Sequence, residues 1–452
     1  MKQLLALIKE NLADIKENFY VIKKSKFTNS VLWHVPSLSI YALDHLHTEM
    51  FTSLLLLSSI EEIENWFEKY EIQLYELKDE LKALINFKNN TDNEDTTVNR
   101  LCLLVSQECS LGCIYCYAHQ GTYNHPSLMD ERTAIKIIDT FSTMFNSIES
   151  IQFFGGEPLL NIGVIRKTIE FVNELVKKGK LRKKPKYFIE TGLGVPFEIM
   201  EQCIDLLKKE PTMNIVVSCD GPEEVQNILR PYKNGKSSFD IVSQNIDLLR
   251  QYNQPIAIEV TYTKIHQEKE ILPRDLKRYF KERFDISKIM IADVMSKDDC
   301  IAIKRNERDY IELSEYLKDR NLIEEILKRR PTVFFCDMGF SNFTVDTKGD
   351  IYACHLLVGI QEFKIGNIYE NSKQLKKKIL QEGEMLYKKR ANKLRYTECQ
   401  NCYLKYYCND CLARRYLLNG EIKISFENCE NMKRVIEDTL LEYVNNNQCH
   451  NE

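Results

Sequence analysis

The chain has 452 residues, of which 44% are hydrophobic and 28% charged, and its formal net charge is −4. This length is too great for one compact core, and the near-balanced charge excludes a general attraction to nucleic acid or to anionic membranes. The N-terminal apolar run is five residues long and ends before Lys9. That is too short for a signal peptide or a membrane span, so we expect a cytoplasmic protein of two or three domains.

Two segments precede the main body of the chain. In residues 1–88 a β-like stretch at 19–35 is followed by amphipathic helical sequence at 60–85, which predicts an α+β unit. Residues 89–98 are polar and poor in apolar side chains, which is typical of a linker.

Six apolar segments alternate with helical patterns across residues 99–295. The helix expected at 130–146 begins at Asp130, a favourable capping residue, and places Ile137 and Phe141 on one face. Such repeats predict a parallel α/β sheet, either open and doubly wound or a partial barrel, with its chemistry at the carboxyl ends of the strands. The expected strands are 100–106, 150–154, 186–191, 214–219, 257–263 and 288–293.

The sequence changes character after residue 295. A helical connection is expected at 296–335, cysteines recur through 336–430, and residues 431–452 form a helix and tail. The chain has fifteen cysteines and no export signal, which favours metal ligation over disulfide bonds. The Cys-rich segment could not build an adequate apolar core, so we expect a small domain organised by metal.

Cys109, Cys113 and Cys116 follow the first expected strand in the spacing C-x3-C-x2-C. Three thiolates on one loop can hold three irons of a four-iron cluster and leave one iron open for a chelating ligand. A zinc site completed by His119 is the main alternative, and a thiol–disulfide enzyme is a weaker one. The aromatic Tyr115 before the third cysteine and the position at a strand end favour the cluster.

In this spacing the sequence resembles the radical S-adenosylmethionine (radical SAM) superfamily over about residues 99–295. The resemblance implies an open (β/α)6 partial barrel, an α/β fold related to the TIM barrel. It also implies a [4Fe-4S] cluster whose open iron binds the amino and carboxylate groups of S-adenosylmethionine. Reductive cleavage of that cofactor gives a 5′-deoxyadenosyl radical, which abstracts hydrogen from the substrate.

Further residues at strand ends match the same family. Gly155, Gly156 and Glu157 end the second strand, where the resemblance implies contact with the methionyl amino group; glycines also allow close approach of the backbone to a ligand. At the end of the fourth strand, the resemblance implies that Ser218 and Asp220 lie near the ribose or carboxylate of the cofactor.

Three further positions bear on cofactor binding. Tyr115 and Arg230 are assigned to the cofactor region by the same resemblance, although Arg230 could equally be a surface arginine of a loop. The third strand departs from the family pattern, because Thr191 is followed by Gly192 where many relatives have Asn-Gly.

Seven later cysteines resemble the SPASM extension of radical SAM enzymes, which carries two auxiliary iron–sulfur clusters. Zinc ribbons also use C-x2-C pairs, so this half alone would be ambiguous. The shortened gap between Cys408 and Cys411 departs from the family, and the barrel-proximal cluster has only three motif cysteines. That cluster would have an open iron, take another ligand such as Cys300, or be smaller. The resemblance assigns Cys399, Cys402, Cys408 and Cys429 to one cluster and Cys336, Cys354 and Cys411 to the other.

The substrate implied by this family is a ribosomally synthesised precursor peptide, with an electron donor such as flavodoxin or ferredoxin. Sulfatase maturases of the group usually have an acidic residue after the second auxiliary-cluster cysteine, whereas this chain has His355. The surrounding sequence looks more like maturases of Cys-rich peptides of the ranthipeptide type, which join cysteine sulfur to carbon in a thioether. Residues 1–88 would then be either a leader-peptide reader or a packing extension of the barrel.

Other functions stay open on the sequence alone. A maturase that forms carbon–carbon links, epimerises residues or makes formylglycine would use the same initial step. A non-catalytic metal-binding protein would need no motifs at the second and fourth strand ends, and those motifs are present.

Overall fold

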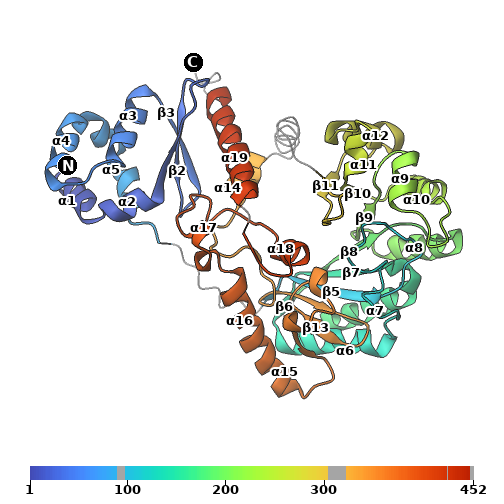
Figure 1. Cartoon of the computed structure of the whole chain (residues 1–452). Coiled ribbons are helices and arrows are strands. Elements are labelled where there is room, and N and C mark those ends of the chain that lie inside the picture. The colour runs from blue at the N-terminus through green and yellow to red at the C-terminus, as the bar shows by residue number, and fades with distance from the viewer. Residues whose placement is uncertain (89–96, 304–321, 425, 448–452) are drawn as a thin grey trace.

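The computed structural model describes residues 1–88, 97–303, 322–424 and 426–447 (Figure 1). The predicted linker 89–98 and helical connection 296–335 therefore lie partly outside the described residues, as does the end of the predicted tail. Of the linker, Thr97–Val98 form β4, which pairs in parallel with β6, Ser147–Ile148.

The N-terminal unit contains a small antiparallel sheet in the order β1-β2-β3, surrounded by helices. One core holds α1, α3, α4 and α5 against the sheet through residues such as Met50 and Trp66. The elements are α1 (Lys2–Glu10), α2 (Leu12–Asn18), β1 (Phe19–Ile22), β2 (Ser30–His34), β3 (Ser39–Leu43), α3 (His45–Leu54), α4 (Ile60–Lys69) and α5 (Glu71–Ile85).

The middle of the chain forms the parallel sheet that the sequence predicts. All six expected strands are present within about one residue of their predicted ends, and helices separate them (Figure 1). The strands are β5 (Arg100–Ser106), β7 (Ser150–Gly155), β8 (Lys186–Thr191), β9 (Asn214–Ser218), β10 (Ile256–Tyr262) and β11 (Ile289–Asp293). The helices are α6 (Glu131–Met144), α7 (Ile162–Lys177), α8 (Phe197–Lys209), α9 (Glu223–Leu229), α10 (Phe239–Gln251), α11 (Lys264–Glu268) and α12 (Pro273–Phe284).

Local sequence explains these elements well. The side chain of Asp130 accepts a hydrogen bond from the Thr133 N–H and caps α6, whose buried face includes Ile137 and Phe141. Strand β5 is almost wholly buried, as expected for an interior strand of a parallel sheet covered by helices. The α/β class is confirmed, and the arrangement is that of a partial TIM-like barrel.

The Cys-rich region extends this sheet, which the sequence did not predict. Strand β12 pairs in parallel with β5, placing Thr344 opposite Cys102, and β13 and β14 continue the sheet in antiparallel fashion. The sheet thus has nine strands, in the order β11-β10-β9-β8-β7-β5-β12-β13-β14. The new strands are β12 (Asn342–Val345), β13 (Asp350–Tyr352) and β14 (Lys364–Asn367). This pairing brings the second Cys-rich region beside the strand that precedes Cys109.

The remaining elements are short turns and helices around the cysteines, followed by one long helix. They are α14 (Leu322–Lys328), α15 (Ser372–Lys378), α16 (Glu384–Leu386), α17 (Thr397–Gln400), α18 (Leu412–Asn419) and α19 (Phe426–Asn447), with π-helical turns at Ile379–Gly383 and Tyr387–Ala391. No helix in the described part of the chain is long and apolar enough to cross a membrane.

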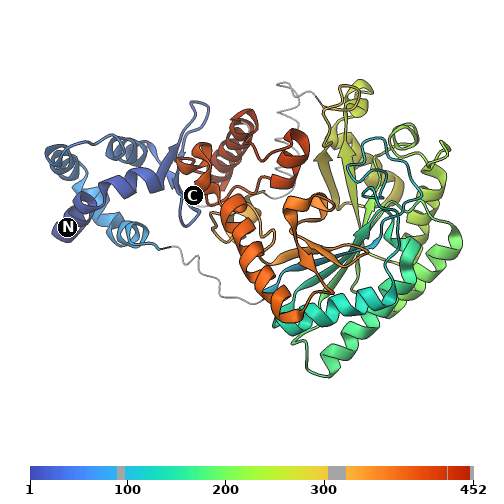
Figure 2. The same cartoon turned by 60° about the horizontal axis from the view of Figure 1, so that its bottom comes forward.

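The N-terminal unit packs on the C-terminal region. Indole Nε1 of Trp33 donates to the Tyr403 carbonyl at 3.1 Å, and the ring of Tyr20 stacks on that of Tyr403 at 4.0 Å. A shared core joins β2 to α14 and α19, and Lys24 pairs with Asp438 at 3.1 Å. Figures 1 and 2 both place this unit beside α19 and away from the barrel helices. These contacts tie residues 1–88 to the C-terminal region, and the role of the unit stays a prediction.

Candidate functional site

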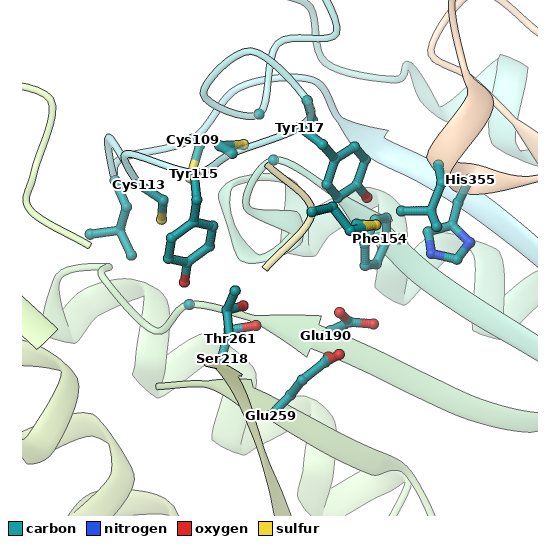
Figure 3. A pocket seen from close by; sticks show the side chains of 18 of the residues that line it. Cys109, Cys113, Tyr115, Tyr117, Phe154, Glu190, Ser218, Glu259, Thr261 and His355 are labelled. Carbon is teal, nitrogen blue, oxygen red and sulfur yellow. The ribbon is translucent and has the colours of Figure 1, made fainter. Parts of the chain in front are cut away.

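A cavity of about 390 Å³ opens at the carboxyl ends of the barrel strands. The loop that carries Cys109, Cys113 and Cys116 forms one wall (Figure 3). His355 and Cys411, from the Cys-rich region, line the same cavity. A molecule in this space would therefore touch both halves of the protein.

The cysteine loop after β5 is held by backbone contacts with the end of α9 and the segment that follows it. The Gly112 N–H donates to the Pro231 carbonyl at 2.7 Å, and the Ile114 N–H donates to the Leu229 carbonyl at 3.0 Å. Burial raises the pKa of the Cys109 thiol to about 12, and Glu157 and Cys113 act in the same direction.

Cys113 and Cys116 also lie close enough for the charge of one to affect the pKa of the other. Burial raises the pKa of Cys113 to about 11, with Arg230 opposing the shift and Cys116 adding to it. The three partly buried cysteines lie on one loop and offer three sulfur ligands, so the donor set fits the cluster that the spacing predicts.

The zinc alternative receives no support from this geometry. His119 is exposed and does not belong to the cavity wall that carries the three cysteines. Within the described residues, no three His, Cys, Asp or Glu side chains are arranged to hold a single metal ion.

Gly155 and Gly156 form part of the cavity wall and cannot be replaced without a clash. Gly155 has φ +135°, and a Cβ on it would lie 1.9 Å from the Ser106 carbonyl oxygen. A Cβ on Gly156 would lie 2.3 Å from the carbonyl oxygen of Glu108. The glycines thus let β7 approach the cysteine loop, and the Gly156 N–H donates to Ser106 at 2.7 Å.

Glu157 does not line the cavity in this structure. Its buried carboxylate accepts hydrogen bonds from the Thr191 hydroxyl at 2.7 Å, the Gly192 N–H at 3.0 Å and the Leu159 N–H at 3.1 Å. Burial raises the pKa of Glu157 to about 7. Thr191 and Gly192, where the family's Asn is absent between the two, both hydrogen-bond to Glu157. Both residues also line the cavity.

Asp220 anchors the groups around it rather than facing the cavity. Its carboxylate accepts from the Tyr115 hydroxyl at 2.5 Å, from Arg230 Nε at 2.8 Å and from the Thr261 N–H at 2.9 Å. The His266 ring completes the anchor through Nε2, 2.8 Å from the Asp220 carbonyl.

Tyr115, Ser218 and Arg230 line the cavity, and their role in binding the cofactor stays a prediction. Arg230 is buried, not a surface arginine, and its guanidinium lies over the Tyr115 ring at 5.3 Å. Its Nη1 also donates to the Cys113 sulfur at 3.9 Å. The pair with Asp220 therefore fixes an arginine between the cysteine loop and the cavity.

The sequence interpretation missed Glu190 and Glu259, which line the cavity from β8 and β10. Figure 3 shows the two carboxyl groups facing each other, and Gln152 Nε2 donates to Glu190 at 3.0 Å. Burial, followed by the neighbouring Glu259, raises the pKa of Glu190 well above its usual range. The available signal was an acidic residue inside each of two otherwise apolar strands.

The later cysteines gather in two sets. Cys336, Cys354 and Cys411 form the first: burial raises the pKa of Cys336 to about 11 and that of Cys354 to about 12, and Cys411 acts on both in the same direction. Cys300 is exposed on the chain after β11. The gap between Cys408 and Cys411 is shorter than in the family, but Cys411 still lies with this set.

The second set contains the other four cysteines. Burial raises the pKa of Cys399 to about 12, and Cys408, Cys402 and Cys429 add to the shift. Burial likewise raises the pKa of Cys429 to about 11, with Cys408 and Cys402 among the neighbours. The resemblance assigns one auxiliary cluster to each of these two sets, and that assignment of individual ligands stays a prediction.

Comparison with protein families agrees with this arrangement. Residues 103–278 match the model of the radical SAM superfamily, and residues 336–403 match SPASM, an iron–sulfur cluster-binding domain. Protein MJ0907 of Methanocaldococcus jannaschii is 30% identical over 63% of this chain and 94% of its own length. A cysteine-type anaerobic sulfatase-maturating enzyme of Clostridium novyi is 24% identical over 59% of this chain and 75% of that enzyme.

Solved structures share the fold at low identity. AnSMEcpe with bound AdoMet superposes with a TM-score of 0.61 and 19% identity, over 77% of this chain and 99% of the other. Streptococcus suis SuiB bound to its precursor peptide SuiA gives a TM-score of 0.51 and 17% identity, over 88% and 95%. The cysteine sets, the strand-end motifs and these matches agree: the chain belongs to the radical SAM superfamily and carries a SPASM domain, so its cofactors are a [4Fe-4S] cluster with S-adenosylmethionine and auxiliary iron–sulfur clusters.

Proposed function

We propose that this enzyme matures a ribosomally synthesised precursor peptide by installing thioether links between cysteine sulfur and carbon. The observation that carries the proposal is the shared cavity, which has Cys109, Cys113 and Cys116 on one wall and Cys411 on another. A peptide in this cavity would lie between the radical source and the first auxiliary set. SuiB, whose structure contains its precursor peptide SuiA, supports a peptide as the substrate class.

The chemistry needs one electron from a donor such as flavodoxin or ferredoxin. With the cluster loaded, cleavage of S-adenosylmethionine supplies the 5′-deoxyadenosyl radical, which takes a hydrogen atom from the acceptor carbon. The cysteine thiol of the peptide loses its proton and its sulfur bonds to that carbon. Each link removes two hydrogens from the peptide, and an auxiliary cluster held by the later cysteines would accept the surplus electron.

The residues of the chain would position the cofactor and the peptide. Asp220 holds Arg230 and Tyr115 beside the cofactor space. Gly155 and Gly156 let the backbone approach a ligand. If Cys336, Cys354 and Cys411 hold a four-iron cluster, one iron would lack a protein thiolate and could take a thiolate of the peptide.

We assign residues 1–88 to recognition of the leader segment of the peptide. The antiparallel sheet of this unit has β3 (Ser39–Leu43) at one edge, and an extended peptide can add a strand to such an edge. The contact of β2 with α19 and Tyr403 supports this role, because it ties the unit to the region that carries the auxiliary clusters.

The test is anaerobic co-expression with a candidate Cys-containing precursor peptide, followed by mass spectrometry with and without thiol alkylation. A thioether product loses two hydrogens and one alkylatable thiol per link. A peptide of unchanged mass, under conditions that do cleave S-adenosylmethionine, contradicts the proposal.

The second candidate is sulfatase-type formylglycine formation, favoured by the similarity to the Clostridium novyi enzyme. Against it, the cavity presents His355 where those enzymes usually have an acidic residue, and its ring packs edge-on against Phe154 at 5.0 Å. The same mass experiment separates the reactions. Formylglycine has lost the sulfur of its cysteine, a carbon–carbon link keeps every thiol, and an epimer keeps the mass.

A further inference from the structure

Lys393 is a lysine with no access to solvent, located in the C-terminal region that carries the second cysteine set. Its side chain is 0% exposed, and it begins a short turn at Lys393–Arg395. Its Nζ donates to the Cys408 carbonyl at 2.6 Å and to the Thr332 carbonyl at 2.9 Å. A buried ammonium is costly unless negative charge compensates it, and these two acceptors are neutral.

The negative charge available at this place is that of the cysteines. Burial lowers the pKa of Lys393; the negative charge of Cys408, Cys399 and Cys402 opposes that shift, and Arg329 adds to it. The Phe335 ring lies 5.7 Å from Nζ. A four-iron cluster held by four thiolates carries net negative charge, and that charge grows when the cluster takes up an electron.

Lys405 offers a matched comparison in the same region. It is also buried, at 4% exposure, and lies between Cys402 and Cys408 in the sequence. Its Nζ, however, forms an ion pair with Glu17 of α2 and a hydrogen bond to the Gln400 carbonyl at 3.2 Å. Its charge is therefore already compensated by a carboxylate, unlike that of Lys393.

We propose that Lys393 is the countercharge of the cluster held by Cys399, Cys402, Cys408 and Cys429, and that it raises the reduction potential of this cluster. A fixed positive charge stabilises the more negative, reduced form more than the oxidised form. Under the proposed function, this makes the cluster a better acceptor for the surplus electron. The potential itself is measured without any peptide, so this inference can fail while the proposed function stands, and the reverse.

The experiment is an anaerobic redox titration of the reconstituted enzyme, followed by electron paramagnetic resonance. The signal of this cluster is assigned by its loss in Cys429→Ala. The variants are Lys393→Gln and Lys393→Met, which remove the charge, Lys393→Arg, which keeps it, and Lys405→Gln as control. At a fixed potential we expect the ratio of reduced to oxidised cluster to fall at least about tenfold in the neutral variants, a shift of about 59 mV for one electron.

We expect Lys393→Arg to stay close to the wild type and Lys405→Gln to change the ratio less than the neutral Lys393 variants do. If the neutral variants lose this cluster while Lys393→Arg keeps it, the charge is required for the cluster to bind, which also supports the inference. An unchanged potential in a neutral variant that keeps its cluster overturns it. Loss of the cluster in all three Lys393 variants also overturns it, because the cluster would then depend on the packing of the lysine side chain and not on its charge.

Discussion

The Asp220–Arg230 pair allows a quantitative test of the cofactor-side geometry. Its side chains are 0% and 9% exposed, and the carboxylate accepts from Arg230 Nε at 2.8 Å and Nη2 at 3.2 Å. Replacing Asp220 with Asn keeps the size but removes the charge and turns one acceptor into a donor that faces Tyr115 or Arg230. Breaking a buried ion pair from one side costs about 3–5 kcal/mol, because the other charge stays buried without compensation.

A second Asp–Arg pair at the same cavity provides the control. Asp293 and Arg414 lie 3.8 Å apart, with side chains 24% and 34% exposed. A solvated pair of this kind contributes about 1 kcal/mol or less, so Asp293→Asn should reduce the free energy of unfolding much less than Asp220→Asn.

Thermal unfolding of the two variants, monitored by circular dichroism, measures the difference. For a unit of 150–250 residues, 1 kcal/mol corresponds to roughly 2–4 °C, so Asp220→Asn should lower the melting temperature by about 6–20 °C and Asp293→Asn by at most about 4 °C. The affinity for S-adenosylmethionine should fall with Asp220→Asn, since Tyr115 and Arg230 lose their anchor. Equal shifts in the two variants, or an unchanged melting temperature for Asp220→Asn, would refute the reasoning.

Three further predictions concern single positions. Gly156→Ala should abolish binding of S-adenosylmethionine in calorimetry, because its Cβ would lie 2.3 Å from the Glu108 oxygen, whereas Gly163→Ala, with nothing within 4 Å, should bind normally. Cys411→Ala should reduce the iron content of the reconstituted protein by one cluster, or about four irons, while Cys300→Ala should leave it unchanged; equal iron in both would contradict the first cysteine set. Burial lowers the pKa of His34 from 6.5 to about 4, so the folded state favours the neutral imidazole. The free energy of unfolding therefore has its full value above pH 6.5 and decreases as the pH falls toward 4, by up to about 3 kcal/mol. Urea unfolding between pH 4 and 7 should show this loss, and His34→Gln should flatten it.

Much of the barrel could be predicted from sequence because its signals are local. The apolar strand β5 is buried on both faces, and Asp130 caps the helix it was expected to begin. The cysteine loop and Gly155–Gly156 were likewise recognisable, since ligand spacing and the need for a missing Cβ are properties of a few consecutive residues.

Other features depend on pairing between distant segments. Strand β12 joins the sheet through hydrogen bonds with β5, more than two hundred residues earlier, and no local pattern specifies that partner. Glu190 and Glu259 face each other because β8 and β10 lie on either side of β9, which their separate sequences do not reveal.

The sequence alone therefore determined the family, the alternating strands and helices, and which cysteines could act as ligands, because each depends on short-range spacing or burial. Only the tertiary structure decided that Asp220 anchors Arg230 instead of lining the cavity, and that Glu157 turns toward Thr191 and Gly192. It also decided that the N-terminal unit packs on α19 and Tyr403. A carboxylate takes whichever donors the fold brings within hydrogen-bonding distance, and the chain order does not fix which donors those are.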